Sequence, residues 1–346
     1  MTAEETLTAY LEPLEAELRR TVDAGLRQPA LYNTMIRYHL GWVDEQGVAL
    51  AEPAHGRGKR VRPLLLLLCA EGVGGSGVRP CALPAAAAVE LLHNFSLIHD
   101  DIQDQSFVRR GRPAVWTIWG AANAINAGDA LYTLAYVALH GLAERGVPDA
   151  DVLRAGRLFA GTCLALTRGQ DRDMAFERLD EVSLDDYLSM IEGKSASLIA
   201  LCAQLGALVA GADDARQAHF AAFGRNLGLA FQIRDDILGI WGDQAITGKS
   251  ARTDIAARKK TLPILYALER SQALRLLYSR ADGPFTPAEL ERAALLVEKT
   301  GAKAFAEEQE AATHAAALAA LREAQPAPGP AQALEALVGR LLGRAR

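Results

Sequence analysis

Aromatic residues are scarce in this chain, and so are cysteines and long hydrophobic runs. Aromatics make up 6% of the 346 residues, whereas alanine and leucine dominate and β-branched residues are sparse. Unbranched side chains lose little rotamer freedom in a helix, so this balance favours helices over strands. Apolar residues make up 50% of the chain, enough for a substantial core, which excludes a small scaffold stapled by disulfides. The composition therefore predicts an all-α protein.

The chain also lacks a long basic tract. Its formal net charge is −5, and residues of both signs are interspersed. A nucleic-acid-binding protein needs clustered Lys and Arg to neutralise phosphates, so this class is excluded. Any polyanionic ligand would have to be bound by a local group of cations.

Signals for export or membrane insertion are missing as well. The N-terminal stretch MTAEETLTAYLEPLEAELRR is acidic and amphipathic, without the basic start and apolar core of a signal peptide. The longest unbroken apolar stretches, such as Leu64 to Ala70, fall well short of the roughly 20 residues that span a bilayer. Cys69, Cys81, Cys163 and Cys202 show no CxxC spacing and fit small core residues in a reducing compartment. We therefore expect a cytoplasmic protein without a membrane span.

Apolar residues recur at helical spacing through most of the chain, as in Leu184, Tyr187, Leu188 and Ile191. We expect about ten helices and no meaningful sheet. Breaks rich in Gly, Pro or Asp are too short for interdomain linkers, which predicts a single domain over residues 1–346. These breaks fall at 52–58, 72–84, 110–113, 146–149, 211–214 and 239–253. The segment QPAPGP at 325–330 sets off a last amphipathic helix, 331–346, where a peripheral tail could begin.

A first group of carboxylates stands in the stretch LIHDDIQDQ. Asp100 and Asp104 are four residues apart, so on a helix they share one face, and Asp101 flanks them. The preceding residues 85–99 are largely apolar and helix-forming, which places the acids near the C-terminal end of a helix, where the macrodipole disfavours negative charge. Cations must compensate, and magnesium commonly takes one or two carboxylates together with phosphate oxygens.

A second group of carboxylates follows another apolar helical run, in FQIRDDILGIWGD. Asp235 and Asp236 stand about 135 positions after the first pair, and Asp243 follows eight residues after Asp235. Gly239 occupies the i+4 position of a matching third acid, so this face offers fewer direct ligands and would hold a metal partly through water. Either group alone could also be a solvated helix end, with Asp as a cap or a surface charge.

Three groups of cations accompany the acids, and most of them lie close to a glycine or a proline. The Arg fork binds pairs of oxygens, Lys supplies a compact charge and glycine lets backbone N–H groups come close, which suits phosphate binding. Ordinary surface charge would explain any one of these residues, but not all of them beside two groups of acids. The cations are Lys59, Arg60 and Arg62, then Arg109, Arg110 and Arg112, and finally Lys249, Lys259 and Lys260.

Several further polar residues lie within apolar helical stretches. His93 precedes the first acids by nearly two helical turns, where it could donate to a phosphate or be a satisfied core histidine. Gln232 shares a helix face with Asp235, three residues further on. Lys194 and Ser195 form a polar pair inside an apolar helix, which costs stability unless the charge is used or reaches water.

Taken in order, these motifs resemble the trans-isoprenyl diphosphate synthases, the family of farnesyl, geranylgeranyl and longer polyprenyl diphosphate synthases. The resemblance runs from about Gly58 to Leu265 and rests on GKRVRP, LIHDDIQD with RRGRP, the GKS element at Lys194, FQIRDDIL, and the final GK and KKT elements. It implies one bundle of long helices around a deep central cavity, usually as a homodimer. It also implies three magnesium ions that link the allylic diphosphate to both groups of acids.

The resemblance assigns roles to the matching residues of this chain. The implied metal ligands are Asp100, Asp104 and Asp235, supported by Asp101, Asp236 and Asp243. The implied allylic diphosphate contacts are Arg109, Lys194, Gln232, Lys249 and Lys259, and the implied isopentenyl diphosphate contacts are Lys59, Arg62, His93 and Arg110. Ser195 is also expected among the substrate-binding residues. The catalytic set is Asp100, Asp104, Arg109, Lys194 and Asp235. The family's second motif usually ends in an acid, so Gly239 departs from it, and we expect activity to survive.

The implied reaction needs no protein nucleophile. Magnesium and the cations draw charge onto the leaving diphosphate, the allylic C–O bond ionises, and the double bond of isopentenyl diphosphate attacks the carbocation. The departing diphosphate then serves as the base that takes the proton. An apolar, dry cavity protects the cation from water.

Product length is expected to be set where the growing tail meets residues of the acid-bearing helix. Phe95 stands five residues before Asp100, and Ser96 beside it is small. A single aromatic at this level, with no insertion in DDIQD, resembles the geranylgeranyl type, so we expect a C20 product and, as the next choice, C15. Leu131 or Tyr132 could also form part of this floor.

Two other classes of protein use parts of the same pattern. A class I terpene cyclase also has helices and an Asp-rich metal site, but it need not bind isopentenyl diphosphate, for which GKRVRP and RRGRP supply cations. A non-catalytic subunit of a heteromeric prenyl synthase would carry a degraded site. Gly239 favours this second alternative, whereas the retained acids and arginines oppose it.

Overall fold

The computed structural model describes residues 3–26, 31–50, 58–179, 181–242, 252–279 and 283–343. Within these ranges the chain is almost entirely helical, as its composition predicts, and the strands form a single short hairpin. Contacts divide the chain into two units. One consists of Met1–Leu158, Gln204–Asp213 and Ala327–Pro330, and the other of Phe159–Ala203, Asp214–Pro326 and Ala331–Arg346.

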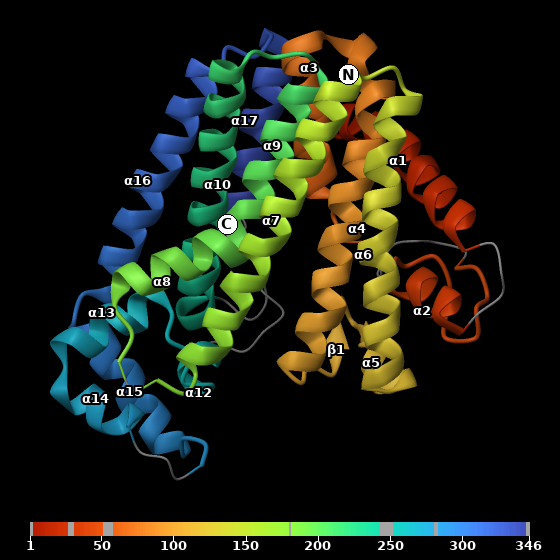
Figure 1. The fold of residues 1–346 in the computed structure, drawn as a ribbon. Helices are drawn as coiled ribbons and strands as arrows, with labels where there is room; N and C mark the ends of the chain where they lie inside the picture. The colour runs from red at the N-terminus through yellow and green to blue at the C-terminus, as the bar shows by residue number, and fades with distance from the viewer. Residues whose placement is uncertain are drawn as a thin grey trace. The chain divides into compact units, whose positions relative to one another are not determined.

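The first unit is built around two long antiparallel helices, α4 and α6, which run side by side (Figure 1). Ala85 to Ala88 of α4 and Ala127 and Ala135 of α6 are fully buried, and such small side chains let two helices pack closely. The elements of this unit are α1 (Ala3–Gly25), α2 (Leu31–His39), α3 (Val61–Gly74), a 3-10 turn (Ser76–Val78), α4 (Arg79–Gln103), β1 (Val108–Arg109), β2 (Arg112–Pro113), α5 (Val115–Trp119), α6 (Ala121–Glu144), the start of α7 (Asp149–Phe176), the end of α9 (Ser197–Val209) and the first residues of α17 (Pro328–Leu342).

The helix that carries the first acids is longer than the sequence pattern indicates. The predicted break at 72–84 is confined to the few residues between α3 and α4, and Pro84 lies inside α4. Among the described residues, Ser76–Gln103 is also the one segment long and apolar enough to cross a membrane by length and composition. However, 72% of its apolar window is buried inside the protein, which is the burial of a core helix.

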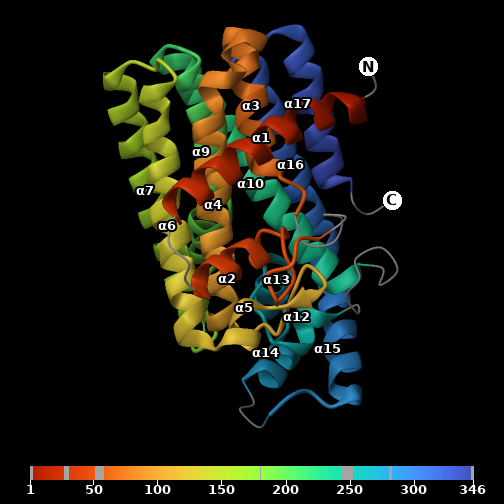
Figure 2. The ribbon, with the colours of Figure 1, turned by 90° about the vertical axis from the view of Figure 1, so that its right-hand side faces the viewer.

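The second unit contains the long helix α10 and most of α7, and α10 lies beside α16 (Figure 2). The elements are the rest of α7, α8 (Leu184–Ile191), a π-helical turn (Glu192–Ala196), the start of α9 (Ser197–Val209), α10 (Asp214–Trp241), α12 (Thr253–Ala256), α13 (Leu262–Arg270), α14 (Gln272–Tyr278), α15 (Pro287–Lys299), α16 (Ala302–Glu323) and most of α17 (Pro328–Leu342).

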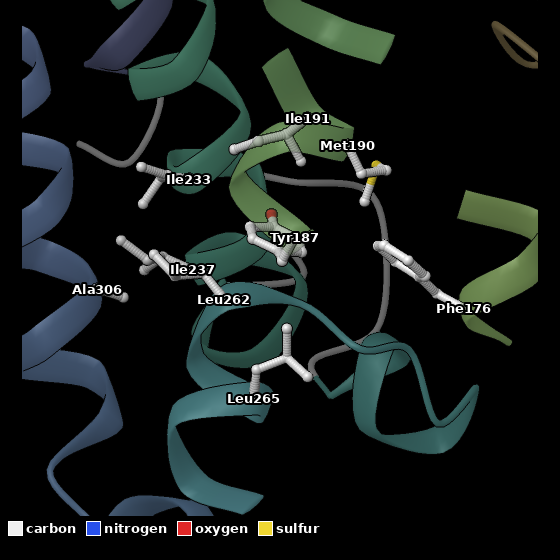
Figure 3. Packing of buried hydrophobic residues seen from close by; sticks show 9 residues of the cluster. All are labelled: Phe176, Tyr187, Met190, Ile191, Ile233, Ile237, Leu262, Leu265 and Ala306. Carbon is white, nitrogen blue, oxygen red and sulfur yellow. The ribbon is translucent and has the colours of Figure 1, made fainter. Parts of the chain in front are cut away.

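Tyr187 of α8 belongs to a buried cluster in this unit, drawn in Figure 3. Its ring packs with Ile233 and Ile237 of α10 and with Leu262 and Leu265 of α13. This packing fixes the end of α10 against the start of α13. The second group of acids is thereby held at a junction of three elements.

The last helix starts at Pro328, slightly earlier than predicted, and buries one face. Leu334, Leu337 and Val338 are among its buried residues. The side chain of Arg234 on α10 also donates a hydrogen bond of 2.9 Å to the carbonyl of Leu342. The C-terminal end of α17 is therefore joined to α10.

The four cysteines form no disulfide. Cys69, Cys163 and Cys202 are buried, as predicted for small core residues. Cys81 is half-buried, and its thiol lies 3.3 Å from the carbonyl of Arg145.

Candidate active site

The first acidic group comprises Asp100, Asp101 and Asp104, in the last turn of α4 and at its C-terminal cap. This is the helix position that the sequence predicts. Asp104 is exposed and Asp100 half-buried, whereas Asp101 is 1% exposed. Asp100 and Asp104 are therefore the carboxylates of this group that an external ligand can reach.

Asp101 instead holds the arginine that follows it. The guanidinium of Arg109 donates two hydrogen bonds to Oδ1 of Asp101, one of them 2.9 Å long from Nε. Burial raises the pKa of Asp101 more than the ion pair with Arg109 lowers it. Its Oδ2 atom is buried and has no hydrogen-bond partner within the described part of the chain. The structure thus gives Asp101 a positioning role toward Arg109.

A tight hairpin brings the arginines of RRGR back to α4. Arg110 and Gly111, between β1 and β2, both have positive φ, of 53° and 74°, as the two central residues of a type I′ turn require. A left-handed conformation is unfavourable for arginine, which marks this turn as a constrained position. Arg109 therefore reaches Asp101, and Arg110 points to the residues one to two turns earlier in α4.

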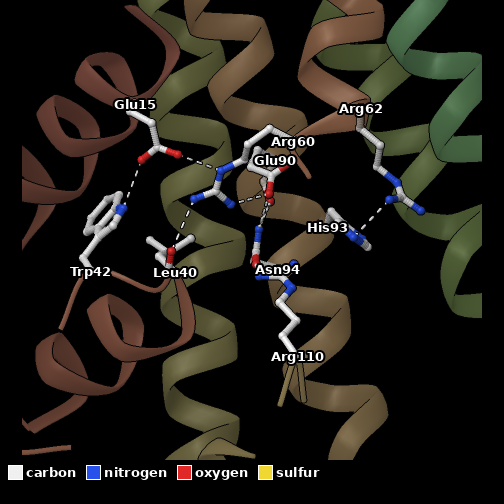
Figure 4. A network of polar contacts seen from close by, with 9 residues as sticks. All are labelled: Glu15, Leu40, Trp42, Arg60, Arg62, Glu90, His93, Asn94 and Arg110. Atoms are coloured by element: carbon white, nitrogen blue, oxygen red, sulfur yellow. Dashed lines mark hydrogen bonds and ion pairs between the residues drawn. The ribbon is translucent and has the colours of Figure 1, made fainter. Parts of the chain in front are cut away.

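The predicted isopentenyl diphosphate residues Arg62, His93 and Arg110 lie together (Figure 4). Arg62 Nη1 is 3.0 Å from His93 Nε2, and Arg110 Nη1 is 3.3 Å from Asn94 Oδ1. Burial, followed by the charges of Arg62 and Arg110, lowers the pKa of His93 well below its usual value. Burial also lowers the pKa of Arg110, to about 10. The structure thus shows a partly desolvated cationic group around a neutral histidine, which suits an anion.

Gly58 and Lys59 stand at the start of the described stretch beside this cationic group. Gly58 has a φ of 69°, and a Cβ built on it would lie 2.8 Å from Cζ of Arg110. The positive φ favours glycine here, and a larger side chain would have to displace the end of the Arg110 side chain. Lys59 has an exposed side chain.

Arg60 is a structural residue, and its grouping with the phosphate-binding cations is wrong. It is 4% exposed and donates to Glu15 at 2.8 Å, to Glu90 at 2.6 Å and to the Leu40 carbonyl at 3.3 Å. Glu90 in turn accepts a 2.8 Å hydrogen bond from Asn94, the partner of Arg110 (Figure 4). This buried network therefore connects Arg60 to Arg110 through Glu90 and Asn94.

The second acidic group shows the same division between its two carboxylates. Asp235 is exposed, whereas Asp236 is 4% exposed. Asp236 accepts hydrogen bonds from the Tyr187 hydroxyl, from the Leu262 backbone N–H at 3.1 Å and from Gln232 at 3.1 Å. Burial raises the pKa of Asp236 to about 7, despite these three donors. Asp236 thus ties α10 to α8 and α13, and Asp235 is the accessible member.

Lys194 and Ser195 lie in the π-helical turn, an irregularity often found at functional sites. The Ser195 hydroxyl donates to Gln232 at 2.6 Å, which joins this turn to Asp236 through Gln232. The Lys194 ammonium forms an ion pair with Asp173 of α7. Ser195 and Gln232 are therefore joined in one hydrogen-bonded chain to Asp236, whereas the side chain of Lys194, in the same turn, pairs with Asp173.

Among the last predicted cations, as among the first, one side chain is exposed and its neighbour is bound to protein groups. Lys259 has an exposed side chain. Lys260 donates to the carbonyls of Phe176, at 2.7 Å, and of Leu179. It thereby links its own segment to the segment at the end of α7. Asp243 and Lys249 lie outside the described residues.

Phe95 and Ser96, the predicted chain-length residues, lie on α4 next to aromatic residues of α6. The Phe95 ring centroid is 5.0 Å from that of Tyr132, and Tyr132 is 5.3 Å from Tyr136. Ser96 donates a 2.9 Å hydrogen bond to the His93 carbonyl. Leu131 is fully buried. An aromatic row therefore continues from Phe95 along α6.

Sequence reasoning does not assign a role to Asn94, Asp173 or Tyr187. Asn94 binds Arg110, Asp173 pairs with Lys194, and Tyr187 binds Asp236. Asp173 ends the polar run RGQDRD inside a long helix, which is the kind of signal that identified Lys194 and Ser195. Asn94 follows His93 in the same apolar stretch, so the signal that identified His93 applies to Asn94 as well, whereas Tyr187 fits the apolar face of its helix and is defined by a partner distant in sequence.

The residues present fit magnesium. Asp100, Asp104 and Asp235 offer carboxylate oxygens at accessible positions, and magnesium commonly uses one or two carboxylates with phosphate oxygens and water. Over the ranges that the structure describes, no three Asp, Glu, His or Cys side chains gather into a ready-made metal site. Each acidic group taken by itself offers the small number of carboxylates that magnesium uses when it is bound together with phosphate oxygens.

Comparison with known proteins agrees with these observations. Residues 48–293 match the family described as polyprenyl synthetase. A geranylgeranyl diphosphate synthase of Mycobacterium tuberculosis is 43% identical over 328 residues, covering 92% of this chain and 90% of that protein. A (2E,6E)-farnesyl diphosphate synthase of Mycobacterium bovis is 44% identical over 238 residues, covering 68% of this chain and 62% of that protein.

The same similarity holds for solved structures. A geranylgeranyl pyrophosphate synthase from Corynebacterium glutamicum, complexed with isoprenyl diphosphate and magnesium, is 27% identical to this chain. The TM-score is 0.82, and the match covers 98% of this chain and 99% of that one. The predicted all-α fold is confirmed.

Proposed function

This chain belongs to the polyprenyl synthetase family, and on that basis we propose that it joins isopentenyl diphosphate to an allylic diphosphate to give geranylgeranyl diphosphate. It is a prenyltransferase that forms a short trans-polyprenyl diphosphate. The observation that carries the condensation is the cationic group of Arg62, His93 and Arg110. Ionisation of an allylic diphosphate alone would not need this second set of anion-binding residues.

The two substrates would use different residues. Lys59, Arg62, His93 and Arg110 would bind isopentenyl diphosphate through charge and hydrogen bonds, without metal. The allylic diphosphate would be bound by Arg109, Lys194, Ser195, Gln232, Lys249 and Lys259 together with the accessible acids. Arg109 is already oriented by Asp101, and Gln232 by Ser195 and Asp236. Such preorganisation lowers the cost of binding a charged group.

The family uses a divalent metal, and we propose three magnesium ions held by Asp100, Asp104 and Asp235. When bound, magnesium withdraws charge from the diphosphate and so favours ionisation of the allylic C–O bond. Asp101 and Asp236 would not contact the metal directly, because each is buried and hydrogen-bonded to protein groups. Their role is to fix the accessible acids and cations in place.

The remaining chemistry needs few protein groups. The double bond of isopentenyl diphosphate attacks the allylic carbocation, and a proton is lost to the departing diphosphate. His93 is a poor acid for this reaction, because Arg62 donates to its Nε2 atom and its pKa is lowered. A neutral His93 can hold a phosphate oxygen by donating from Nδ1 while it accepts from Arg62.

Product length remains part of the proposal, since similar proteins include both a geranylgeranyl and a farnesyl diphosphate synthase. Phe95 backed by Tyr132 gives a broad aromatic floor on α4 and α6, which supports a defined short product. We keep C20 as the expected product and C15 as the next choice. A homodimer in the cytoplasm is likewise proposed from family membership.

The test is incubation of the purified protein with isopentenyl diphosphate and C5, C10 or C15 allylic diphosphates, with magnesium or with chelator. A linear C20 product that requires magnesium is expected. Asp100→Asn, Asp104→Asn and Asp235→Asn should each lower kcat about a hundredfold or more. Asp23→Asn, in an exposed ion pair with Arg37, should leave kcat unchanged. A cyclic hydrocarbon would indicate a cyclase, and no elongation would indicate a partner-dependent subunit.

A further inference from the structure

The side chain of Asn94 is fully buried on α4, between a carboxylate and an arginine (Figure 4). Its Nδ2 atom donates to the Glu90 carbonyl at 2.7 Å and to Oε1 of the Glu90 carboxylate at 2.8 Å. Its Oδ1 atom accepts a hydrogen bond of 3.3 Å from Nη1 of Arg110. The amide therefore links an acid one turn earlier in α4 to the arginine between β1 and β2.

The hydrogen-bond partners define the orientation of this amide. Nδ2 carries two hydrogens, and each has an acceptor on Glu90. A rotated amide would place Oδ1 against these two acceptors and Nδ2 against a guanidinium, which only donates. The orientation with Oδ1 toward Arg110 is the one that satisfies all three contacts.

We propose that Asn94 is a positioning residue for the condensation, which holds the Arg110 guanidinium in the orientation that binds the diphosphate of isopentenyl diphosphate. The inference rests on the proposed function, which places Arg110 in that site. Asn94 does not reach the substrate, because its side chain is 0% exposed. It acts through Arg110 alone.

The carboxylate that orients Asn94 is itself fixed by a buried ion pair. Arg60 donates to Oε1 of Glu90 at 2.6 Å, and both side chains are almost completely buried. Arg60 is held in turn by Glu15 of α1, at 2.8 Å, and by the Leu40 carbonyl, at 3.3 Å. Asn94 thus has a rigid support that reaches beyond its own helix, which is what a positioning residue requires.

The charges around Arg110 explain why it needs a fixed acceptor. Its pKa is lowered chiefly by burial and further by the positive charges of Arg60, Arg109 and Arg62. Glu90 has the opposite effect. Repulsion among the arginines favours movement of the half-buried guanidinium toward water, and a hydrogen bond to a fixed amide oxygen opposes that movement.

The experiment measures the Kd of isopentenyl diphosphate by titration calorimetry of the full chain with chelator, so that no turnover occurs. Asn94→Leu keeps the size of the side chain and removes the amide, and it should raise this Kd about tenfold or more. Asn94→Ser should have the same effect, because a hydroxyl can bond the Glu90 carbonyl but is too short for Arg110. Melting temperatures show whether each variant is folded.

A double-mutant cycle separates positioning from a general structural effect. Arg110→Ala alone should raise the Kd at least as much as Asn94→Leu. Adding Asn94→Leu to Arg110→Ala should change the Kd by less than about twofold, since the residue through which Asn94 acts is already gone. A rise in Kd as large in the Arg110→Ala background as in the original protein would overturn the inference.

Steady-state kinetics give a second readout. In Asn94→Leu the KM for isopentenyl diphosphate should rise by about tenfold, whereas the KM for the allylic diphosphate should change by less than about twofold. The reason for the difference is that Asp101, and not Asn94, orients Arg109. An equal rise in both KM values would contradict a specific action on Arg110.

Asn123→Leu is the matched control, because Asn123 is an exposed asparagine of α6 that donates in the same way, at 2.8 Å, to the Trp119 carbonyl four residues earlier. It should leave the Kd and both KM values unchanged. An unchanged Kd in both Asn94→Leu and Asn94→Ser would overturn the inference. An original protein that binds isopentenyl diphosphate in an Asn94-dependent way but makes no elongated product would contradict the proposed function alone.

Discussion

The guanidinium of Arg62 donates a hydrogen bond to Nε2 of His93, with 3.0 Å between the two nitrogens (Figure 4). Arginine carries donors only, so Nε2 must supply a lone pair, and the proton of the neutral ring lies on Nδ1. The surrounding charges agree, because burial, Arg62 and Arg110 all lower the pKa of His93. The hydrogen bond thus defines both the charge and the tautomer of His93.

This geometry predicts that the protein loses stability at acid pH. The folded pKa of His93 lies below the unfolded value of about 6.5, so the unfolded chain binds more protons than the folded chain below that pH. The free energy of unfolding should therefore fall as the pH drops below about 6.5, by at most about 1.4 kcal/mol per pH unit from this residue. His39, whose pKa is also lowered by burial, should add to the effect.

Urea unfolding of metal-free protein between pH 5 and 8 would measure this effect. His93→Gln keeps a neutral acceptor for Arg62 and should make the pH dependence shallower. His140→Gln, at an exposed position, should leave it as in the original protein. An unchanged slope in His93→Gln would show that the ring is not held neutral.

Removing the buried cation at Arg60 is predicted to destabilise the first unit strongly. Arg60→Ala leaves Glu15 and Glu90 buried without their partner, which costs about 3–5 kcal/mol. Arg37→Ala breaks an exposed ion pair with Asp23 and should cost less than about 1 kcal/mol. Chemical denaturation compares the two variants. Similar losses for both would mean that the buried network contributes no more than a surface pair.

Gly169 is predicted to be required where α7 approaches the π-helical turn. A Cβ at Gly169 would overlap the Lys194 backbone nitrogen and lie 2.7 Å from its Cα, so Gly169→Ala should displace the turn. We expect a loss of about 1–3 kcal/mol and a clear fall in kcat. Thermal unfolding and product formation would be measured together.

Gly161 provides the matched control on the same helix. A Cβ there meets no atom within 4 Å, so Gly161→Ala should gain up to about 1 kcal/mol from helix propensity and keep full activity. If both variants behave alike, the close contact at Gly169 does not govern the position of Lys194.

The aromatic row on α4 and α6 predicts how product length can be changed. Phe95→Ala removes the first ring and exposes Tyr132 behind it, so the main product should become at least one isoprene unit longer. Tyr132→Ala should have a smaller effect while Phe95 is present. Chromatography of the dephosphorylated products gives the distribution. Val137→Ala, on an exposed part of α6, is the control and should leave the product distribution unchanged. An unchanged distribution in Phe95→Ala would show that Phe95 does not limit product length.

Much of this protein could be predicted from the order of its residues. The helical periodicity predicts the helix that ends at Asp100 and Asp104, and the spacing of the acids predicts which of them share a face. The Gly- and Pro-rich pattern predicted too long a break before α4, since Pro80 lies in the first turn of the helix, where proline is tolerated, and Pro84 lies inside the helix.

Which residues of each motif are buried and which are accessible could not be predicted from the sequence. Arg60 and Arg62 are two residues apart and chemically alike, yet Arg60 is buried between Glu15 and Glu90 whereas Arg62 contacts His93. Asp235 and Asp236 differ in the same way. Neighbouring side chains on a helix point in directions about 100° apart, so their surroundings depend on what packs against each side.

The sequence by itself determined the helical class, the places where acids and cations concentrate, and the family of enzymes. The helical class and the concentrations of charge depend on composition, periodicity and spacing, which are local properties of the chain, and the family follows from the resemblance of its ordered motifs. Only the tertiary structure decided which acids are accessible and which histidine is neutral. Each of these depends on residues far apart in sequence that packing brings to within hydrogen-bond distance.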